Sequence, residues 1–336
     1  MDWTMLDVHN LTNSCRIDEY KRPVFVGVYS LVLAVGLVCN TAALYVFVGL
    51  TRRKTASTIF MTNLATSDLF FNLTLPYRIA YYWQNQWTLG TFLCRLSTYA
   101  FYLNLYASIY FLTALSVFRY VAILHPVRAK TLVSVRRAWL ACLAIWLFIG
   151  LSSAPFLRAS PHKRQGRMRC FEPHTMSWGQ ILKMNYMALV LGFLLPFLAI
   201  VACYGRIVLR LWSPSYRLKR SARSNRKPVY MIFIVLSSFL FCFLPYHVAR
   251  TVHLHLMAQG RDCQQQTLLV HKAIVATLCL AAANSCLNPL LYYFVGENFR
   301  RLVKSALTFR RGGHSALSIS SYPPRTATTV VVPEAP

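Results

Sequence analysis

Seven long, apolar stretches with almost no charge alternate with short polar segments along this chain. Six of them contain no charged residue: 24–51, 96–118, 138–157, 184–205, 229–249 and 273–296. The seventh, 55–76, contains only Asp68. Each is about 20 residues or longer, the length that an α-helix needs to cross the hydrocarbon core of a membrane. Because backbone polar groups in lipid must be satisfied internally, the pattern predicts an all-α membrane protein with a seven-transmembrane helix bundle.

The remaining segments suggest how the chain is organised around the bundle. We predict an extracellular N-terminus at 1–23, the seven-transmembrane bundle at 24–296, a short amphipathic membrane-surface helix at 297–309 and a flexible cytoplasmic tail at 310–336. In the surface helix, apolar and basic residues fall on different sides, as an interfacial helix requires. The first 23 residues lack the layout of a signal peptide. We therefore expect the first spanning helix to act as an uncleaved insertion signal.

Charge decides the orientation. The formal net charge is +27, with 56% hydrophobic and 13% charged residues. With the N-terminus outside, the inner segments and the tail hold 21 basic residues against two acids, Glu297 and Glu334. Basic loops stay cytoplasmic, so we predict an extracellular N-terminus and a multi-pass protein of the plasma membrane. The basic runs are expected to contact anionic membrane lipids and not nucleic acid. The outer sequon at Asn10 predicts glycosylation.

The ten cysteines form two groups. Six lie within the apolar stretches, where cysteine usually serves as a small packing residue. Cys15, Cys94, Cys170 and Cys263 lie in or beside outer segments, in an oxidising compartment. Four cysteines allow three pairings. One of these would tie Cys94 to Cys170, holding the second outer loop over the bundle, and Cys15 to Cys263, holding the N-terminus to the third outer loop.

Asp68 is the one charged residue inside the seven stretches. Ionisable groups within membrane spans are costly and usually functional. Asn104 and Ser108, one turn apart, and Asn284 and Asn288, likewise spaced, could supply polar partners. A small cation takes an oxygen cage of this kind, so one interpretation is a sodium site at Asp68, Asn104 and Ser108. The other is a protonated or water-bridged carboxyl that only joins helices. No other cofactor is expected.

Two arginines are expected at similar depth near the outer ends of the helices. Arg78 lies ten residues beyond Asp68, about 15 Å nearer the outer surface. No carboxylate in the upper helices pairs with Arg78 or Arg250, and a guanidinium suits a carboxylate or phosphate. We therefore expect an anionic ligand there, although each arginine could instead reach out to water or headgroups. The residues expected around this ligand are Arg78, Tyr102, Tyr106, Tyr246, Arg250 and His253.

Several motifs together resemble the rhodopsin-like G-protein-coupled receptors, over about residues 24–308. They are Asn40; Leu64-Ala65 with Asp68; Cys94; Arg119; Trp146; Pro196 with Tyr204; Phe239 with Phe243-Leu244-Pro245; and Asn288 to Tyr292. The resemblance implies a ligand-gated switch that opens toward a heterotrimeric G protein. Its switch residues would be Arg119, Tyr204, Phe243, Asn288, Pro289 and Tyr292. Two positions depart from the family pattern, since Phe118 replaces an acid and Phe243 replaces a tryptophan.

Within that family, four segments resemble the cysteinyl leukotriene receptors without separating type 1 from type 2. They are 96–120, 170–173, 245–255 and 281–299. The resemblance implies an acidic lipid ligand, a Gq-type G protein acting through phospholipase C and calcium, and arrestin binding to the Ser/Thr-containing tail. It also places Ser152 and Ser153 at the ligand. A receptor for nucleotides or small dicarboxylates is the alternative, because paired arginines suit those ligands too.

Two other classes of membrane protein are less consistent with the sequence. A transporter would show internal repeats or interrupted helix pairs, and the chain has neither. An intramembrane enzyme would need a catalytic set, but His247, His253 and His255 form no metal motif with carboxylates. No Ser/His/Asp set is expected at one depth. We therefore predict that the chain is not an enzyme.

Overall fold

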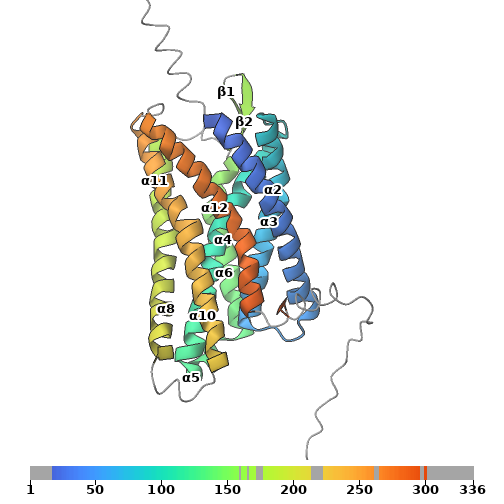
Figure 1. Cartoon of the computed structure of the whole chain (residues 1–336), viewed down its shortest axis with the longest axis vertical. Helices are drawn as coiled ribbons and strands as arrows, with labels where there is room; N and C mark the ends of the chain where they lie inside the picture. The colour runs from blue at the N-terminus through green and yellow to red at the C-terminus, as the bar shows by residue number, and fades with distance from the viewer. Residues whose placement is uncertain are drawn as a thin grey trace, which may run out of the picture.

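The computed structural model describes residues 17–158, 160–164, 166–171, 177–212, 222–260, 265–295 and 299–300. They form an elongated bundle of long helices, with a small hairpin at one end and a short helix at the other (Figure 1). In the described part of the chain, six helices are long and apolar enough to cross a membrane. The seventh span is α3 (Ala56–Gln84). Many of its polar side chains are buried inside the bundle. The predicted seven-helix, all-α class is confirmed.

The described elements follow the chain in a simple order. The first half contains α2 (Ile17–Leu44), η1 (Tyr45–Leu50), α3 (Ala56–Gln84), α4 (Gly90–Leu124), α5 (Pro126–Leu132), α6 (Val135–Ser153) and η2 (Ala154–Arg158). The second half contains β1 (His162–Arg164), β2 (Arg167–Arg169), α7 (Trp178–Met187), η3 (Ala188–Leu194), α8 (Leu195–Trp212), α10 (Ala222–Ser237), η4 (Ser238–Phe243), α11 (Leu244–Ala258) and α12 (Gln265–Val295). The fifth span is α7–η3–α8 and the sixth is α10–η4–α11.

Local sequence explains where several helices begin and end. The hydroxyls of Thr55 and Ser134 accept backbone N–H groups of the first turn of α3 and α6, at 3.2 and 3.3 Å. Ser177 forms a capping box at the start of α7. Such caps satisfy donors that a helix N-terminus leaves free. At the other end of α3, Asn85 takes a left-handed conformation (φ 55°), which stops the helix.

Prolines shape the fifth and sixth spans. Pro196 and Pro245 lie just after the π-helical segments η3 and η4. Proline lacks an N–H, and its ring clashes with the carbonyl four residues earlier, so the preceding turn cannot keep regular α-helical bonding. The wider π-helical turn accommodates this clash, and such turns are often found at functional sites. The prolines thus locate two irregular turns in the middle of the bundle.

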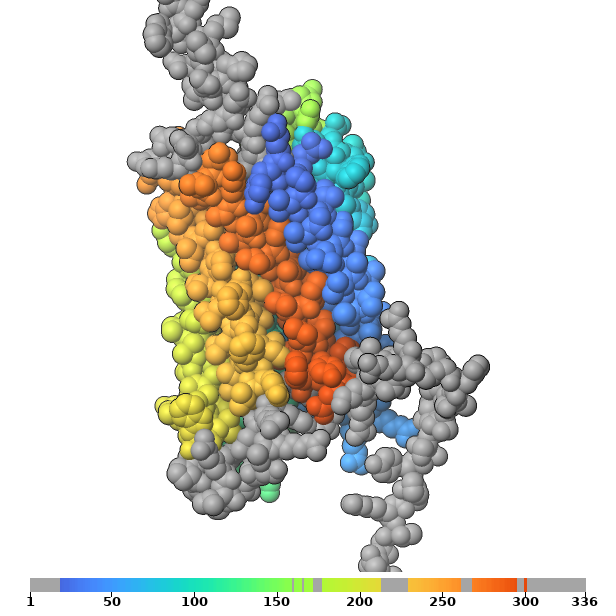
Figure 2. All heavy atoms as spheres, viewed as in Figure 1, coloured from blue at the N-terminus to red at the C-terminus, as the bar shows by residue number. Residues whose placement is uncertain are grey.

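Apolar side chains cover the outside of the bundle as well as its centre. Leu147, Leu198 and Phe233 are among many large apolar residues that are more than half exposed. Such a surface fits lipid contact, because soluble monomers rarely expose extended apolar patches. On the face seen in Figure 2, α12 lies between α2 and the sixth span, and it packs against both.

Polar side chains join the helices internally. The Asn40 amide on α2 donates to the carbonyls of Gly36 and Ser285, the latter on α12 at 3.0 Å. The indole N–H of Trp146 on α6 donates to Asn63 on α3 at 2.9 Å. Hydrogen bonds of this kind hold helices together where lipid supplies no hydrophobic driving force. They also explain why α3, with many buried polar residues, is less apolar than the other spans.

A disulfide and a hairpin close the outer end. Cys94 on α4 is bonded to Cys170, with a Cα–Cα distance of 6.0 Å, which confirms this predicted pair. Before Cys170, β1 and β2 pair antiparallel, with Arg164 opposite Arg167 at the tip. The backbone N–H of Trp87 donates to the carbonyl of Met168 at 3.0 Å, which joins the hairpin to the α3–α4 turn.

Several predictions fall outside the described residues. They are the second disulfide between Cys15 and Cys263, glycosylation at Asn10, nearly all of the surface helix at 297–309 and the tail at 310–336. The domain boundaries that depend on these segments stay predictions.

Candidate functional site

A cavity of about 440 Å³ lies in the outer half of the bundle. Its walls come from α4, α6, η2, α7, η3 and α11, with Phe171 of the second outer loop on one side. Proteins bind small molecules in cavities of roughly 300–1,000 Å³. Size and enclosure therefore make this space the candidate ligand site.

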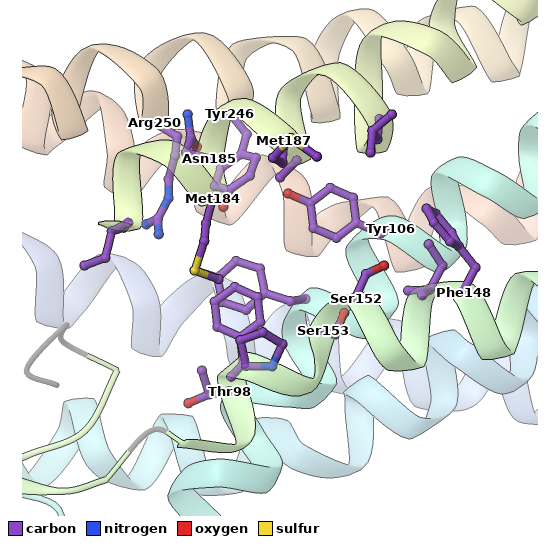
Figure 3. A pocket seen from close by; sticks show the side chains of 18 of the residues that line it. Thr98, Tyr106, Phe148, Ser152, Ser153, Met184, Asn185, Met187, Tyr246 and Arg250 are labelled. Atoms are coloured by element: carbon purple, nitrogen blue, oxygen red, sulfur yellow. The ribbon is translucent and has the colours of Figure 1, made fainter. Parts of the chain in front are cut away.

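One end of the cavity is polar and carries a positive charge. Arg250 projects into it from α11, and the phenol of Tyr106 points toward it from α4 (Figure 3). Tyr102, Tyr106 and Tyr246 all interact electrostatically with the Arg250 guanidinium. The Tyr102 ring centroid lies 6.0 Å from the guanidinium carbon. Arg250 has no hydrogen bond or ion pair with the described part of the chain. An acid group on a ligand would accept hydrogen bonds from the Arg250 guanidinium and balance its charge.

The rest of the lining is largely apolar. Phe148, Met184, Met187 and Leu191 belong to it, and Figure 3 shows the two methionines on the side of the fifth span. Methionine side chains are flexible and can fit an irregular chain. Ser152 and Ser153 also line the cavity, on α6. Six of the eight predicted ligand contacts, all except Arg78 and His253, thus meet around one space.

Sequence reasoning missed three features of this cavity. The Asn185 amide lines the cavity and donates to Thr251 on α11 at 2.9 Å, joining the outer ends of the fifth and sixth spans. Phe156 stacks on Tyr102, with ring centroids 3.7 Å apart. A Cβ at Gly192 would lie 2.6 Å from the Tyr106 ring, so only glycine permits this approach. Pro196, one turn after Gly192, was a sequence signal for an irregular turn. Nothing in the sequence indicated that this turn would pack against Tyr106.

Arg78 and His253 lie close to the cavity without lining it. Arg78 is buried, and its guanidinium donates to the Ser97 carbonyl at 2.8 Å. The guanidinium carbon lies 4.2 Å from the centroid of the Phe171 ring and 5.1 Å from that of Phe101. His253 packs edge-on against His271 of α12, with centroids 4.7 Å apart. Ligand contact by either residue stays a prediction.

The Asp68 cluster lies deeper in the bundle. Asp68 is fully buried, and its two carboxylate oxygens accept amide N–H bonds from Asn104 at 2.9 Å and Asn288 at 2.8 Å. The buried Ser108 hydroxyl and the Asn284 carbonyl oxygen have no hydrogen-bond partner among the described residues. The two helices whose amides hold the Asp68 carboxylate, α4 and α12, therefore also carry a buried oxygen atom with spare hydrogen-bonding capacity. This donor set fits a small cation.

Aromatic rings connect the cavity to the predicted switch at Phe243. His247 lies between Tyr106, at 6.0 Å, and Phe193, at 4.7 Å between ring centroids. Phe193 then meets Phe239 at 6.0 Å, and Phe239 meets Phe243 at 5.4 Å. Close-packed side chains transmit strain to their neighbours, so these rings form a continuous path of contacts. This path leads from Tyr106 on α4 to Phe239 and Phe243, which lie in the π-helical segment η4 of the sixth span.

The inner end holds the remaining predicted switch residues. The Arg119 Nε atom is buried and has no hydrogen-bond partner among the described residues. Phe118, which stands where the family usually has an acid, packs against Phe60 with centroids 4.8 Å apart. Tyr204 and Ser116 share a hydrogen bond of 2.6 Å between α8 and α4. The inner end of α4 around Arg119 is therefore held by the packing of Phe118 and by the neutral Tyr204–Ser116 hydrogen bond.

Comparisons with known proteins agree with this architecture. Residues 39–292 match the family model described as 7 transmembrane receptor (rhodopsin family). The chain is 40% identical to human cysteinyl leukotriene receptor 1 over 326 residues, covering 96% of this chain and 95% of that receptor. It is 42% identical to human cysteinyl leukotriene receptor 2 over 310 residues, covering 91% and 87%. Lysophosphatidic acid receptor 6 of Gallus gallus is 35% identical over 298 residues, covering 87% and 96%.

Proposed function

Because the chain belongs to the rhodopsin family of seven-transmembrane receptors, and within it to the cysteinyl leukotriene receptor type, we propose that it binds an acidic lipid mediator of the cysteinyl leukotriene class. It is a multi-pass receptor of the plasma membrane and not an enzyme. Identity to the two leukotriene receptor types is nearly equal, so the ligand is proposed as a class without a subtype.

The observation that carries this proposal is the unequal polarity of the cavity. Arg250 and three phenols gather at one end, and Phe148, Met184, Met187 and Leu191 lie along the rest. A molecule with an acid group and a long apolar chain satisfies both ends. A nucleotide or a small dicarboxylate would satisfy the arginine but leave the apolar walls without a partner, and burial of apolar surface is the larger favourable term for such walls.

We further propose signalling through a Gq-type G protein, phospholipase C and calcium, followed by arrestin binding to the tail. A ligand can shift the bundle only as far as it binds one arrangement better than the other. A ligand that contacts Tyr106 could do this through the row of rings that ends at Phe243. Arg119 and Tyr204 would then rearrange at the inner end to accept the G protein.

Sodium is proposed as an allosteric ligand at Asp68, Asn104 and Ser108. The support is chemical, because Asp68 is a buried carboxylate, and the buried Ser108 and Asn284 oxygens on the two helices that hold it lack partners in the described part of the chain. A bound cation would supply positive charge to Asp68, while Asn104 and Asn288 orient its two oxygens. Since these residues come from α3, α4 and α12, occupancy of the site would favour one arrangement of these helices.

A calcium-mobilisation panel tests the ligand class directly. Cells that express the chain would be exposed to cysteinyl leukotrienes, nucleotides and small dicarboxylates, with the Arg119→Ala variant and untransfected cells as controls. We expect a calcium response to the leukotrienes alone, lost in Arg119→Ala and on phospholipase C inhibition. A response to nucleotides or dicarboxylates without one to leukotrienes would refute the proposed ligand in favour of the alternative.

A further inference from the structure

Phe171 lies between the ligand cavity and a second buried arginine in the outer bundle. On one side its ring lines the 440 Å³ cavity that contains Arg250. On the other side the ring packs under the guanidinium of Arg78, at 4.2 Å. Arg78 is only 5% exposed and does not line the cavity. One aromatic side chain therefore stands between the cavity and the second arginine.

The buried polar groups around Arg78 have unused hydrogen-bonding capacity for an acid group. One guanidinium nitrogen donates to the Ser97 carbonyl, but the buried Nε atom has no hydrogen-bond partner among the described residues. The Ser97 hydroxyl, fully buried, has none there either. The phenol of Tyr29 on α2 lies within hydrogen-bonding reach of the Arg78 guanidinium, so the capacity that is left lies at Nε and at the Ser97 hydroxyl. Buried donors without partners cost free energy, which an entering carboxylate would recover.

Phe171 is held in place by several contacts that are individually weak. Its ring meets the rings of Tyr81 and Trp87 edge-on, with centroids 5.3 and 5.5 Å apart. Its φ of 71° lies in the left-handed region, which is unfavourable for a bulky side chain. Backbone strain of this kind is typical of ligand clamps and switches. The disulfide of Cys170 fixes the backbone on one side, so displacement would fall on the ring.

We infer that Phe171 is a specificity-determining gate, an inference that rests on the proposed function for the kind of ligand. A ligand with one acid group binds at Arg250 and leaves Phe171 against Arg78. A ligand with a second acid group displaces the Phe171 ring and places that group between Arg78 and Ser97. The exchange is favourable because a charge-assisted hydrogen bond to a carboxylate is stronger than a cation–π contact.

A labelling experiment tests the gate without any assumption about the ligand. Ser97→Cys places a thiol of similar size behind Phe171, and the anionic reagent 2-sulfonatoethyl methanethiosulfonate probes its access from outside. We expect slow labelling in Ser97→Cys and labelling about tenfold faster when Phe171→Ala is added, because access controls thiol reactivity. The parent chain, with its native cysteines, supplies the background.

Phe156→Ala is the matched control, because Phe156 also lines the cavity and stacks on a neighbouring ring without contacting Arg78. It should leave the labelling of Ser97→Cys unchanged. Where Phe171→Ala reaches the cell surface poorly, Phe171→Leu makes the same test, since leucine is smaller and lacks the aromatic face. Equal labelling rates with and without Phe171 would overturn the gate.

A second experiment tests the selectivity of the gate. A leukotriene conjugated to cysteinylglycine carries two carboxyl groups, and each can be blocked as its methyl ester. We expect Phe171→Ala to raise the affinity of the diacid about tenfold and to give no gain for at least one ester. Adding Arg78→Ala should remove the gain. Equal changes for the diacid and both esters would refute the gate, whereas failure of the parent to bind any of the three would refute only the proposed function.

Discussion

Arg250 in the outer half and Asp68 in the middle of the bundle are both charged side chains in an apolar environment, but their surroundings differ. Asp68 accepts amide bonds at 2.9 and 2.8 Å from two other helices. Arg250 stands among three phenols at the edge of a 440 Å³ cavity without a hydrogen bond to the described chain. The amide groups of Asn104 and Asn288 orient the Asp68 carboxylate between three helices, whereas Arg250 has no such partner in the described part of the chain and faces the cavity, where an acid group of a ligand can bind it. Ligand binding and coupling should therefore be separable by mutation.

The largest effect is expected from the disulfide at the outer end. Cys94→Ser or Cys170→Ser frees a loop spanning 76 residues of sequence, and native disulfides contribute about 2–5 kcal/mol. We expect ligand binding to be lost and surface expression to fall. Radioligand saturation with surface staining measures both. Cys203→Ser, at a half-buried free cysteine on α8, is the control and should bind normally. Normal binding by both disulfide variants would show that the outer half does not need this restraint.

At the inner end, we expect Arg119→Ala to suppress activation of the G protein while ligand affinity stays within about twofold. The reason is distance, since Arg119 lies at the opposite end of α4 from Thr98 and Tyr102, which line the cavity. A nucleotide-exchange assay beside a saturation curve measures the two properties. Arg136→Ala, at an exposed inner arginine, is the control. A large loss of affinity in Arg119→Ala would remove the proposed separation.

Arg250→Ala should have the opposite profile. Loss of one charge-assisted bond costs about 1.5–3 kcal/mol, or about ten- to a hundredfold in affinity. Maximal G-protein activation at saturating ligand should be retained. Competition binding with a diacid leukotriene and with its methyl esters measures the loss, which should be smaller for one of the esters. If all these ligands lose affinity equally, Arg250 supports the cavity wall and does not bind an acid.

A smaller effect is expected from Gly192→Ala in η3. The added methyl group would lie 2.6 Å from the Tyr106 ring, and overpacking of this kind costs about 1–3 kcal/mol. Displacement of Tyr106 should lower ligand affinity about tenfold. Gly205→Ala is a matched control on α8, because nothing lies within 4 Å of its added carbon. Equal affinities for the two variants would mean that Tyr106 is free to move aside.

The smallest effect on ligand affinity is expected from Asp68→Asn. The new amide would point a donor at the amide of Asn104 or Asn288, which costs about 1–3 kcal/mol of stability. We expect a lower melting temperature in detergent, weaker sodium dependence of agonist binding and impaired signalling. Asn63 lies on the same helix as Asp68, and Asn63→Ala, which breaks its bond to Trp146 of α6, should lower stability without changing sodium dependence. If agonist binding depends on sodium concentration in the same way in the parent and in Asp68→Asn, the ion site is excluded.

Part of the candidate site could be predicted because it depends on spacing within single helices. Tyr102 and Tyr106 are one turn apart, as are Tyr246 and Arg250, so each pair shares a face in any regular helix. All four side chains line the same cavity. The Asp68 partners were predicted in the same way, from depth and polarity. The position of Arg78 relative to the cavity could not be predicted, because it depends on Phe171 in a distant loop.

The sequence by itself determined the class, the number of spans and the choice of helices that carry the polar groups. These follow from the cost of exposing charge and backbone to lipid, which acts on each segment separately. Only the tertiary structure decided how these segments meet. The pairing of Cys94 with Cys170, the approach of Tyr106 to Gly192 and the position of Phe171 beneath Arg78 all join residues far apart in the chain. Such contacts depend on the rotation and bending of whole helices, which no periodic pattern records.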